Sequence, residues 1–337
     1  MKLLVTGGAG FIGSTFIRLA LRERPDWRIV NFDKLTYAGN LENLAAVAAD
    51  PRYSFVKGDI CDAAAAGAAF DQAEPEAVIH FAAESHVDRA ILAPQTFFET
   101  NLRGTFTLLE MARARRTPRF LHVSTDEVYG SIDPPADADE SYPLRPSSPY
   151  SASKAGSDLL ALSYFATYRT PVIVTRASNN YGPYHFPEKL IPLMISNAID
   201  DKPLPIYGDG LQVRDWLFVE DHCRALMAVL ERGRTGEIYN VGGNRSLPNL
   251  EVVRRILDQV GKPESLMQTV ADRPGHDRRY ALSSEKLMRE TGWAPRVNFE
   301  EGLALTIRWY QENREWVRRV QSGEYRDYYR RNYENRV

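Results

Sequence analysis

The chain has little cysteine and almost no net charge. It carries two cysteines in 337 residues, and its formal net charge is −2. Cys61 and Cys223 lie far apart and lack the spacing of metal ligands, so we predict two free thiols in a reducing cytoplasm and no bound metal. A charge this close to zero provides no basic surface for nucleic acid, and no nucleic-acid partner is expected.

Long apolar runs are also missing. No run reaches the ~18 residues that a membrane-spanning helix needs, so we expect no membrane partner. Met1 and Lys2 lead directly into the apolar residues 3–5, from which we expect no signal peptide. The hydrophobic share of 44% and the charged share of 26% are typical of a globular protein. The length allows one large domain or two ordinary ones.

The first half of the chain alternates short apolar segments with segments of helical periodicity. Strands are predicted at residues 2–6, 27–33, 53–59, 77–82, 119–125 and 171–178. Helices are predicted at residues 11–24, 41–49, 63–73, 96–115 and 150–168. This alternation predicts an α/β fold, a Rossmann-type doubly wound parallel sheet with helices on both faces.

The pattern changes after residue 178, where prolines and glycines crowd residues 182–210 and predict loops with short elements. A helix at 219–232 and a strand at 237–241 follow, then helices at 249–260, 283–291 and 299–321. We therefore predict a smaller, discontinuous α/β substrate domain. The nucleotide domain would comprise residues 1–178 with roughly 219–243 and 281–298, and the substrate domain roughly 179–218, 244–280 and 299–337.

A glycine-rich segment joins the first predicted strand to the first helix. Gly7, Gly10 and Gly13 have the spacing that allows a tight turn and close approach of a pyrophosphate to the helix N-terminus. Asp33 ends the second strand, where a carboxylate can accept hydrogen bonds from an adenosine ribose. Its charge would repel a 2′-phosphate, so NAD is favoured over NADP, although Lys34 argues mildly in the other direction.

Further strand ends supply candidates for the same cofactor. Asp59 and Ile60 follow the third strand and are placed to meet an adenine, although a strand-end capping role explains Asp59 equally well. Residues 81–85 end the fourth strand, and the small residues among them would let a dinucleotide lie close.

A possible catalytic group follows the fifth strand. Asp126 and Glu127 come directly after it, at the sheet edge where ligands bind in open α/β sheets. Tyr150 and Lys154 are four residues apart and project from one helix face. An ammonium beside a phenol lowers the pKa of the phenol, so this pair predicts an activated tyrosine. Taken alone, each pair could equally be solvated side chains at the surface.

These motifs and others resemble the dTDP-glucose 4,6-dehydratase family, within the extended short-chain dehydrogenase/reductase superfamily. The resemblance runs from Met1 to about Tyr329. It is carried by residues 32–40, 80–89, 125–127, 179–183, 187–192, 205–210, 214–216 and 272–277. The sequence departs from the family pattern at Ala90, where serine is usual, and at Ala177, where cysteine is common.

The resemblance implies a redox-neutral dehydration of a nucleotide-bound glucose, with a tightly bound NAD that is recycled in each turnover. Tyr150 would take the proton of the C4 hydroxyl, with Lys154 lowering its pKa and holding the nicotinamide ribose. Thr125 would hydrogen-bond the C4 oxygen. Glu127 would remove the C5 proton, and a protonated Asp126 would act as general acid on the departing C6 hydroxyl.

The same resemblance implies the binding residues. Together with Tyr150 and Lys154, the cofactor would contact Gly7, Gly10, Phe11, Ile12, Gly13, Asp33, Lys34, Leu35, Thr36, Asp59, Ile60, Phe81, Ala82, Ala83, Ser85, Thr100 and Asn180. Besides the catalytic Thr125, Asp126 and Glu127, the nucleotide-sugar would contact Ser85, Asn179, Lys189, Leu190, Pro205, Ile206, Tyr207, Arg214, Asn249, Arg273 and His276. Among these, Arg214 and Arg273 would meet the pyrophosphate. His86 is as readily a structural residue as a functional one.

Several alternatives stay open. A 4-epimerase or a decarboxylase shares the glycine loop and the Tyr150–Lys154 pair, so Asp126 is the residue that distinguishes a dehydratase. Thymidine and uridine present similar edges, and a UDP-glucose 4,6-dehydratase is equally compatible. A non-enzymatic NAD sensor would typically have lost the tyrosine or the lysine. The family implies a homodimer, to which Leu159, Leu160, Leu162 and Phe165 would contribute unless they belong to the core.

Overall fold

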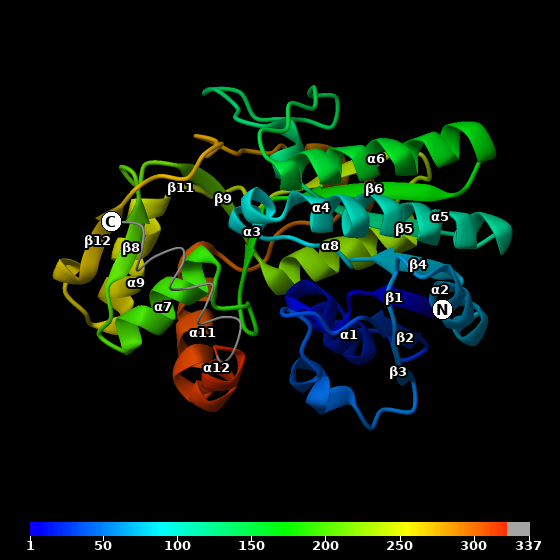
Figure 1. The fold of residues 1–337 in the computed structure, drawn as a ribbon, viewed down its shortest axis with the longest axis horizontal. Coiled ribbons are helices and arrows are strands. Elements are labelled where there is room, and N and C mark those ends of the chain that lie inside the picture. Colours follow the sequence, from blue (N-terminus) through cyan, green and yellow to red (C-terminus); the bar gives the residue numbers. More distant parts are fainter. Residues whose placement is uncertain (322–337) are drawn as a thin grey trace.

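The computed structural model describes residues 1–321, so the end of the predicted substrate domain lies outside the described residues. Its main sheet has seven parallel strands in the order β10-β6-β5-β4-β1-β2-β3 (Figure 1). These strands are β1 (Lys2–Thr6), β2 (Arg28–Asp33), β3 (Tyr53–Lys57), β4 (Ala77–His80), β5 (Phe120–Thr125), β6 (Val172–Ala177) and β10 (Ile238–Val241). The strand order reverses between β1 and β4, and a crevice for a ligand opens at such a point. The predicted Rossmann-type sheet is confirmed.

Helices cover both faces of this sheet because its buried strands are apolar on both sides. Leu3 and Val5 of β1 pack with α1 (Phe11–Glu23), α8 (Val219–Arg232) and α10 (Glu285–Thr291). Leu4, which points the other way, packs with α2 (Ala63–Ala73), α5 (Thr105–Ala114) and α6 (Pro149–Tyr168). The alternation along one strand therefore divides the core into two layers.

A second group of elements lies beyond the carboxyl ends of the strands (Figure 1). It contains a three-stranded sheet in the order β11-β9-β7 and a parallel pair, β12-β8. Its elements are β7 (Asn179–Tyr181), α7 (Leu190–Ile199), β8 (Leu204–Tyr207), β9 (Val213–Phe218), β11 (Ser246–Pro248), α9 (Asn249–Val260), η4 (Glu264–Leu266), β12 (Met267–Val270), α11 (Phe299–Glu312) and α12 (Arg314–Val320). They share a separate hydrophobic cluster that includes Tyr181, Ile195, Trp216, Ile256 and Leu303. This separate cluster supports the predicted division of the chain, which stays a prediction.

Three predicted helices differ in the structure. The first is a 3₁₀ helix, η1 (Leu41–Val47). The second is divided into α4 (Pro94–Phe97), a π-helical segment η2 (Phe98–Gly104) and α5, and a short α3 (Val87–Leu92) precedes it. The third is interrupted at Asn313, whose backbone (φ −111°, ψ 40°) departs from the helical conformation. Within residues 1–321, no helix combines the length and apolar character needed to cross a membrane.

Candidate active site

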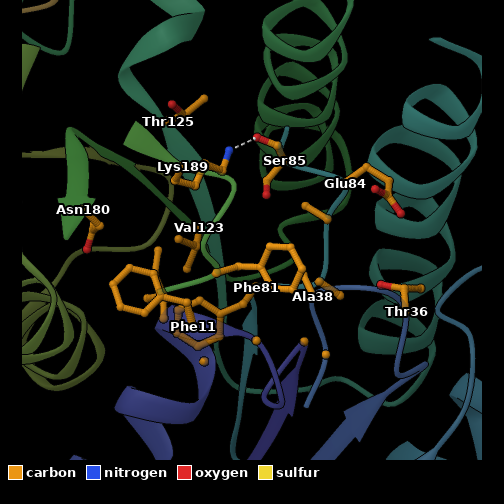
Figure 2. A pocket seen from close by; sticks show the side chains of 18 of the residues that line it. Phe11, Thr36, Ala38, Phe81, Glu84, Ser85, Val123, Thr125, Asn180 and Lys189 are labelled. Atoms are coloured by element: carbon orange, nitrogen blue, oxygen red, sulfur yellow. Dashed lines mark hydrogen bonds between the residues drawn. The ribbon is translucent and has the colours of Figure 1, made fainter. Parts of the chain in front are cut away.

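A cavity of about 380 Å³ lies along the carboxyl ends of the sheet strands. The β1–α1 loop, the ends of β2 to β6 and the start of α6 form one side, and residues 177–191 close the other. Figure 2 shows Phe11, Val123, Asn180 and Lys189 around this space. The cavity therefore lies between the two parts of the fold, where a dinucleotide and a second ligand can meet.

The glycine loop is shaped to admit a phosphate. Gly7 has a φ of +72°, and a Cβ there would lie 2.5 Å from the Ala82 nitrogen. At Gly13 a Cβ would lie 2.4 Å from the Gly7 carbonyl oxygen. Gly10 is the N-cap of α1, and no side chain caps the helix. The backbone N–H groups of the first turn are thus presented to a ligand, which fits a pyrophosphate.

Asp33 lies at the end of β2 and lines the cavity. Its Oδ2 accepts a hydrogen bond from the Ala9 nitrogen at 2.9 Å, and its Oδ1 accepts one from the Leu35 nitrogen at 2.8 Å. Burial raises the pKa of this carboxyl, and the two backbone donors oppose the rise. Leu35 has a left-handed backbone (φ +59°) and does not line the cavity, so its predicted contact with the cofactor stays a prediction. Lys34 forms an ion pair with Asp59 at 2.7 Å.

The acid pair opens a short 3₁₀ helix, η3 (Asp126–Tyr129), directly after β5. Thr125 caps this helix by accepting from the Glu127 nitrogen at 3.3 Å, and its hydroxyl donates to Asp126 Oδ1 at 3.2 Å. The tight turn brings both carboxyls to the cavity wall. This turn was not predicted, although a threonine followed by two acids is a typical helix start.

The two carboxyls have different surroundings. Burial raises the pKa of Asp126 well above its usual value, and the neighbouring charge of Glu127 raises it further. Burial also raises the pKa of Glu127, but the positive charges of Arg273, Lys189 and Arg214 oppose this. These surroundings favour the protonated form of Asp126, while the positive charges favour ionisation of Glu127. Adjacent carboxyls held in different protonation states can serve as acid and base together.

Tyr150 and Lys154 lie on the first two turns of α6, which is held by a reciprocal cap. The Ser151 nitrogen donates to Ser148 Oγ at 3.1 Å, and the Ser148 nitrogen donates to Ser151 Oγ at 3.0 Å. Pro149 occupies the first turn, where the missing N–H costs nothing. The cap fixes where the helix begins and so directs both catalytic candidates at the cavity.

The expected lowering of the Tyr150 pKa is not seen. Burial raises the pKa of Tyr150, the Glu127 charge raises it further, and a hydrogen bond with Thr125 opposes the rise. Lys154 Nζ donates to the Val123 carbonyl oxygen at 2.8 Å. Burial lowers the pKa of Lys154 to about 8. The ammonium is thus anchored on β5, and its influence on Tyr150 remains a proposal.

Most predicted binding residues line this one cavity. On the cofactor side these are Gly7, Gly10, Phe11, Ile12, Gly13, Asp33, Lys34, Thr36, Asp59, Ile60, Phe81, Ala82, Ala83, Ser85, Thr100 and Asn180. On the substrate side they are Asn179, Lys189 and Leu190, with the catalytic candidates between the two sets. Lys189 Nζ donates to the Ser85 carbonyl oxygen at 2.8 Å and links the two parts of the fold (Figure 2).

Seven predicted substrate residues do not line the cavity: Pro205, Ile206, Tyr207, Arg214, Asn249, Arg273 and His276. Several of them bond to protein groups instead. The Tyr207 hydroxyl donates to Asp88 Oδ2 at 2.9 Å, and Arg273 lies 3.7 Å from Asp88 Oδ1. Arg214 donates to the Asp277 carbonyl oxygen at 3.0 Å. Because the charges of Arg214 and Arg273 still act on Glu127, this cluster lies beside the acid pair.

The structure adds residues that the sequence analysis missed. Glu188 is buried, accepts from Arg89 Nε at 3.1 Å and shares a hydrogen bond with Tyr37. His86 Nε2 lies 3.4 Å from the Glu188 carbonyl oxygen, so His86 joins the same contact. His222 Nδ1 lies 2.9 Å from Asn180 Oδ1 at the cavity wall. Tyr37 lies within residues 32–40 and Glu188 within residues 187–192, two of the motifs that carry the family resemblance. That position was the one signal in the sequence that could have identified them.

Comparisons with known proteins agree with these motifs. The family described as GDP-mannose 4,6 dehydratase matches residues 4–306. A dTDP-glucose 4,6-dehydratase of Shigella flexneri is 52% identical, with 100% of both chains covered. One from Neisseria meningitidis serogroup B is 54% identical over 96% of this chain and 97% of its own.

Solved structures give the same result. A dTDP-glucose 4,6-dehydratase of Streptomyces venezuelae with NAD bound superposes with a TM-score of 0.92 at 52% identity, covering 95% of this chain and 100% of its own. A UDP-glucose 4-epimerase of Thermus thermophilus in complex with NAD has a TM-score of 0.86 at 32% identity, covering 93% and 100%. The fold is common to both activities, and the higher identity is to the dehydratase.

Proposed function

The chain belongs to the dTDP-glucose 4,6-dehydratase family, and we propose that it converts dTDP-glucose to dTDP-4-keto-6-deoxy-glucose with NAD as its cofactor. One observation carries the proposal beyond the family. Asp126 and Glu127, two adjacent carboxyls with different charges around them, share one cavity with Tyr150. An epimerase needs only the tyrosine, whereas a dehydratase needs all three groups.

The first step belongs to Tyr150, Lys154 and Thr125. NAD, which the glycine loop and Asp33 would hold, would supply the redox chemistry as hydride acceptor for the oxidation at C4 and hydride donor for the reduction at C6, which protonation at C5 completes. Tyr150 takes the proton of the C4 hydroxyl, while the Thr125 hydroxyl, already hydrogen-bonded to Tyr150, holds the C4 oxygen. The Lys154 ammonium stabilises the Tyr150 phenolate once the nicotinamide ribose and the sugar are bound beside both side chains.

The elimination belongs to the acid pair. The ketone at C4 acidifies the C5 proton, so a carboxylate of modest basicity is enough to remove it, and Glu127 does so. Asp126 delivers its proton to the C6 hydroxyl, which leaves as water. The positive charges of Arg273, Lys189 and Arg214 favour an ionised Glu127, so Asp126 is the acid and Glu127 the base.

The substrate lies across the two parts of the fold. Ser85, Asn179 and Lys189 hold the hexose, because all three line the cavity near the acid pair. Arg214 and Arg273 exchange their present protein partners for pyrophosphate oxygens, to which guanidinium forks are well matched. The thymidine end meets Leu190, Pro205, Ile206, Tyr207, Asn249 and His276.

The test is product identity. The purified protein is given dTDP-glucose, and the nucleotide-sugar product is identified by NMR. We expect a 4-keto-6-deoxy sugar, without net change in the NAD to NADH ratio. UDP-glucose in a parallel reaction measures the preference for the base. A galactose nucleotide without any 4-keto-6-deoxy product would contradict the dehydratase function.

We also propose a homodimer, formed through α5, α6 and the adjoining π-helical segment. Phe98, Phe106 and Leu159 are 55%, 47% and 58% exposed on these elements, and a patch of large apolar side chains is typical of an interface. Leu160, Leu162 and Phe165 instead pack against the core, so only Leu159 of the predicted four faces outward. Light scattering should give twice the chain mass, and Leu159→Glu should lower it to that of one chain.

For the location of the enzyme we propose the cytoplasm. Cys61 and Cys223 are both free thiols, which is consistent with a reducing compartment. Fractionation of cells that express the protein, with detection by antibody, tests this location. Recovery from an extracytoplasmic fraction would contradict it.

A further inference from the structure

The face of α6 that carries Tyr150 and Lys154 continues inward to a third residue. Asp158 follows Lys154 by four residues, as Lys154 follows Tyr150, so the three side chains share one face of the helix. Asp158 is fully buried, and Lys154 is 4% exposed. Asp158 does not line the cavity and has no part in the steps described above.

Asp158 is held by side chains from two neighbouring strands. Arg176 of β6 donates from Nε to Asp158 Oδ2 at 2.9 Å. His122 of β5 places Nε2 3.3 Å from Asp158 Oδ1. Although burial opposes ionisation, the contact with His122 and the charge of Arg176 lower the pKa of Asp158. Asp158 is therefore a carboxylate in the interior of the protein.

The arrangement behind Asp158 is itself rigid. Arg176 donates from Nη1 to the Tyr129 hydroxyl at 2.9 Å, and Tyr129 donates to Asn240 Oδ1 at 2.8 Å. Arg176, Tyr129 and Asn240 are all buried. Since each group is fixed by the next, the Asp158 carboxylate cannot rotate out of its position without breaking several buried hydrogen bonds.

Asp158 is the negative charge that acts on Lys154. Burial lowers the pKa of Lys154, and the attraction of Asp158 opposes that effect. The other titratable groups that face Lys154 are Tyr150 on its own helix, His80 on β4 and His122 on β5. Burial lowers the pKa of both histidines, so neither adds a charge near neutral pH.

A spacing of four residues on one helix face makes Asp158 and Lys154 neighbours. The Asp158 charge also raises the pKa of Tyr150, so the help that Asp158 gives the C4 oxidation acts through Lys154. We propose that Asp158, held by Arg176, is a positioning residue that keeps Lys154 charged for its role toward Tyr150. This inference rests on the proposed function because it assigns Lys154 a role in the C4 oxidation.

The test is the pH profile of kcat for Asp158→Asn, which removes the charge and keeps the shape. An opposite charge at close range typically moves a pKa by about 1–3 units. We expect the alkaline limb to move to lower pH by at least about one unit. Above the limb, kcat should fall about tenfold relative to wild type, and below it kcat should stay near the wild-type value.

Two further variants separate charge from structure. Ser157→Ala removes a hydroxyl that lies 3.1 Å from His122 Nε2 in the same network but changes no charge. The alkaline limb of its kcat profile should therefore match that of wild type. Asp158→Asn leaves Arg176 buried without its carboxylate, which can prevent folding. The double variant Asp158→Asn with Arg176→Met removes both charges and should show the same shift as Asp158→Asn.

An unchanged limb in the double variant would overturn the inference. A kcat reduced by the same factor at every pH would do so too, because that is the behaviour of a purely structural residue. Failure of the proposed function gives a different result, since wild type would then form no 4-keto-6-deoxy sugar at any pH. The two hypotheses can thus fail separately.

Discussion

Replacing Asp126 or Glu127 with the corresponding amide should block different steps of the reaction. Glu127→Gln removes the base at C5, so neither solvent deuterium at C5 nor eliminated product should form. Asp126→Asn removes the acid at C6, so C5 exchange should continue while water loss becomes slow. Oxidation at C4 should occur in both variants, because Tyr150 and Lys154 are untouched.

The magnitude follows from the contacts of each carboxyl. A positioned acid or base typically contributes ~10²–10⁴-fold in rate. Asp126 Oδ1 accepts from the Thr125 hydroxyl at 3.2 Å, and an asparagine oxygen can keep that bond. The loss in Asp126→Asn should therefore lie within that range, with the cavity wall intact. The amide can hydrogen-bond the C6 oxygen but cannot donate a proton to it.

Stability offers an independent check on the protonation of Asp126. Because burial raises its pKa in the folded state, the protonated carboxyl is stable at low pH. That stability is lost as pH rises from the unfolded pKa through the raised folded pKa. Asp126→Asn cannot ionise, so near neutral pH its Tm should equal or exceed that of wild type.

The assay combines three measurements on one sample. Stopped-flow absorbance follows cofactor reduction on the enzyme, NMR in D₂O follows deuterium at C5, and product analysis follows water loss. Equal loss of the C4 oxidation in both variants would mean that the acids only position the substrate. A Tm of Asp126→Asn well below wild type at neutral pH would mean that Asp126 is a stabilising carboxylate.

Three more outcomes are expected. NAD should copurify with the protein, because a redox-neutral cycle favours a cofactor that stays bound; denatured protein that releases no dinucleotide would argue otherwise. Tyr150→Phe should lower kcat by ~10²–10⁴-fold through loss of the phenol, with circular dichroism unchanged; turnover like wild type would exclude Tyr150 as the base. Asp33→Ala should weaken NAD binding and reduce the preference over NADP, and calorimetry on apoprotein showing unchanged NAD affinity would contradict this.

Local sequence patterns predicted most strands of the main sheet and the cofactor half of the site. Strands such as β1 and helices such as α1 and α8 are apolar runs or amphipathic patterns, and such local signals predict elements well. The roles of Gly7, Gly13 and Asp33 can be recognised locally. The spacing of the glycines and a carboxylate at a strand end are visible without the rest of the fold.

The second part of the fold was less visible. β7, β8 and β9 are short, and prolines and glycines crowd residues 182–210, so the sequence predicted only loops with short elements there. Their register depends on partners far away in the chain, such as β12 for β8. A pattern confined to one segment cannot contain that pairing.

What the sequence determined by itself was the identity of the chemistry. The glycine loop, the acid pair, and the tyrosine with its lysine are residue types that a dehydratase requires, whatever their exact placement. Only the tertiary structure decided how those groups are charged. Nearby positive charges set Glu127 apart from Asp126. The strands beneath α6 bring Arg176 and His122 to Asp158. Protonation depends on desolvation and on charges that come from other strands, and a linear sequence does not contain these distances.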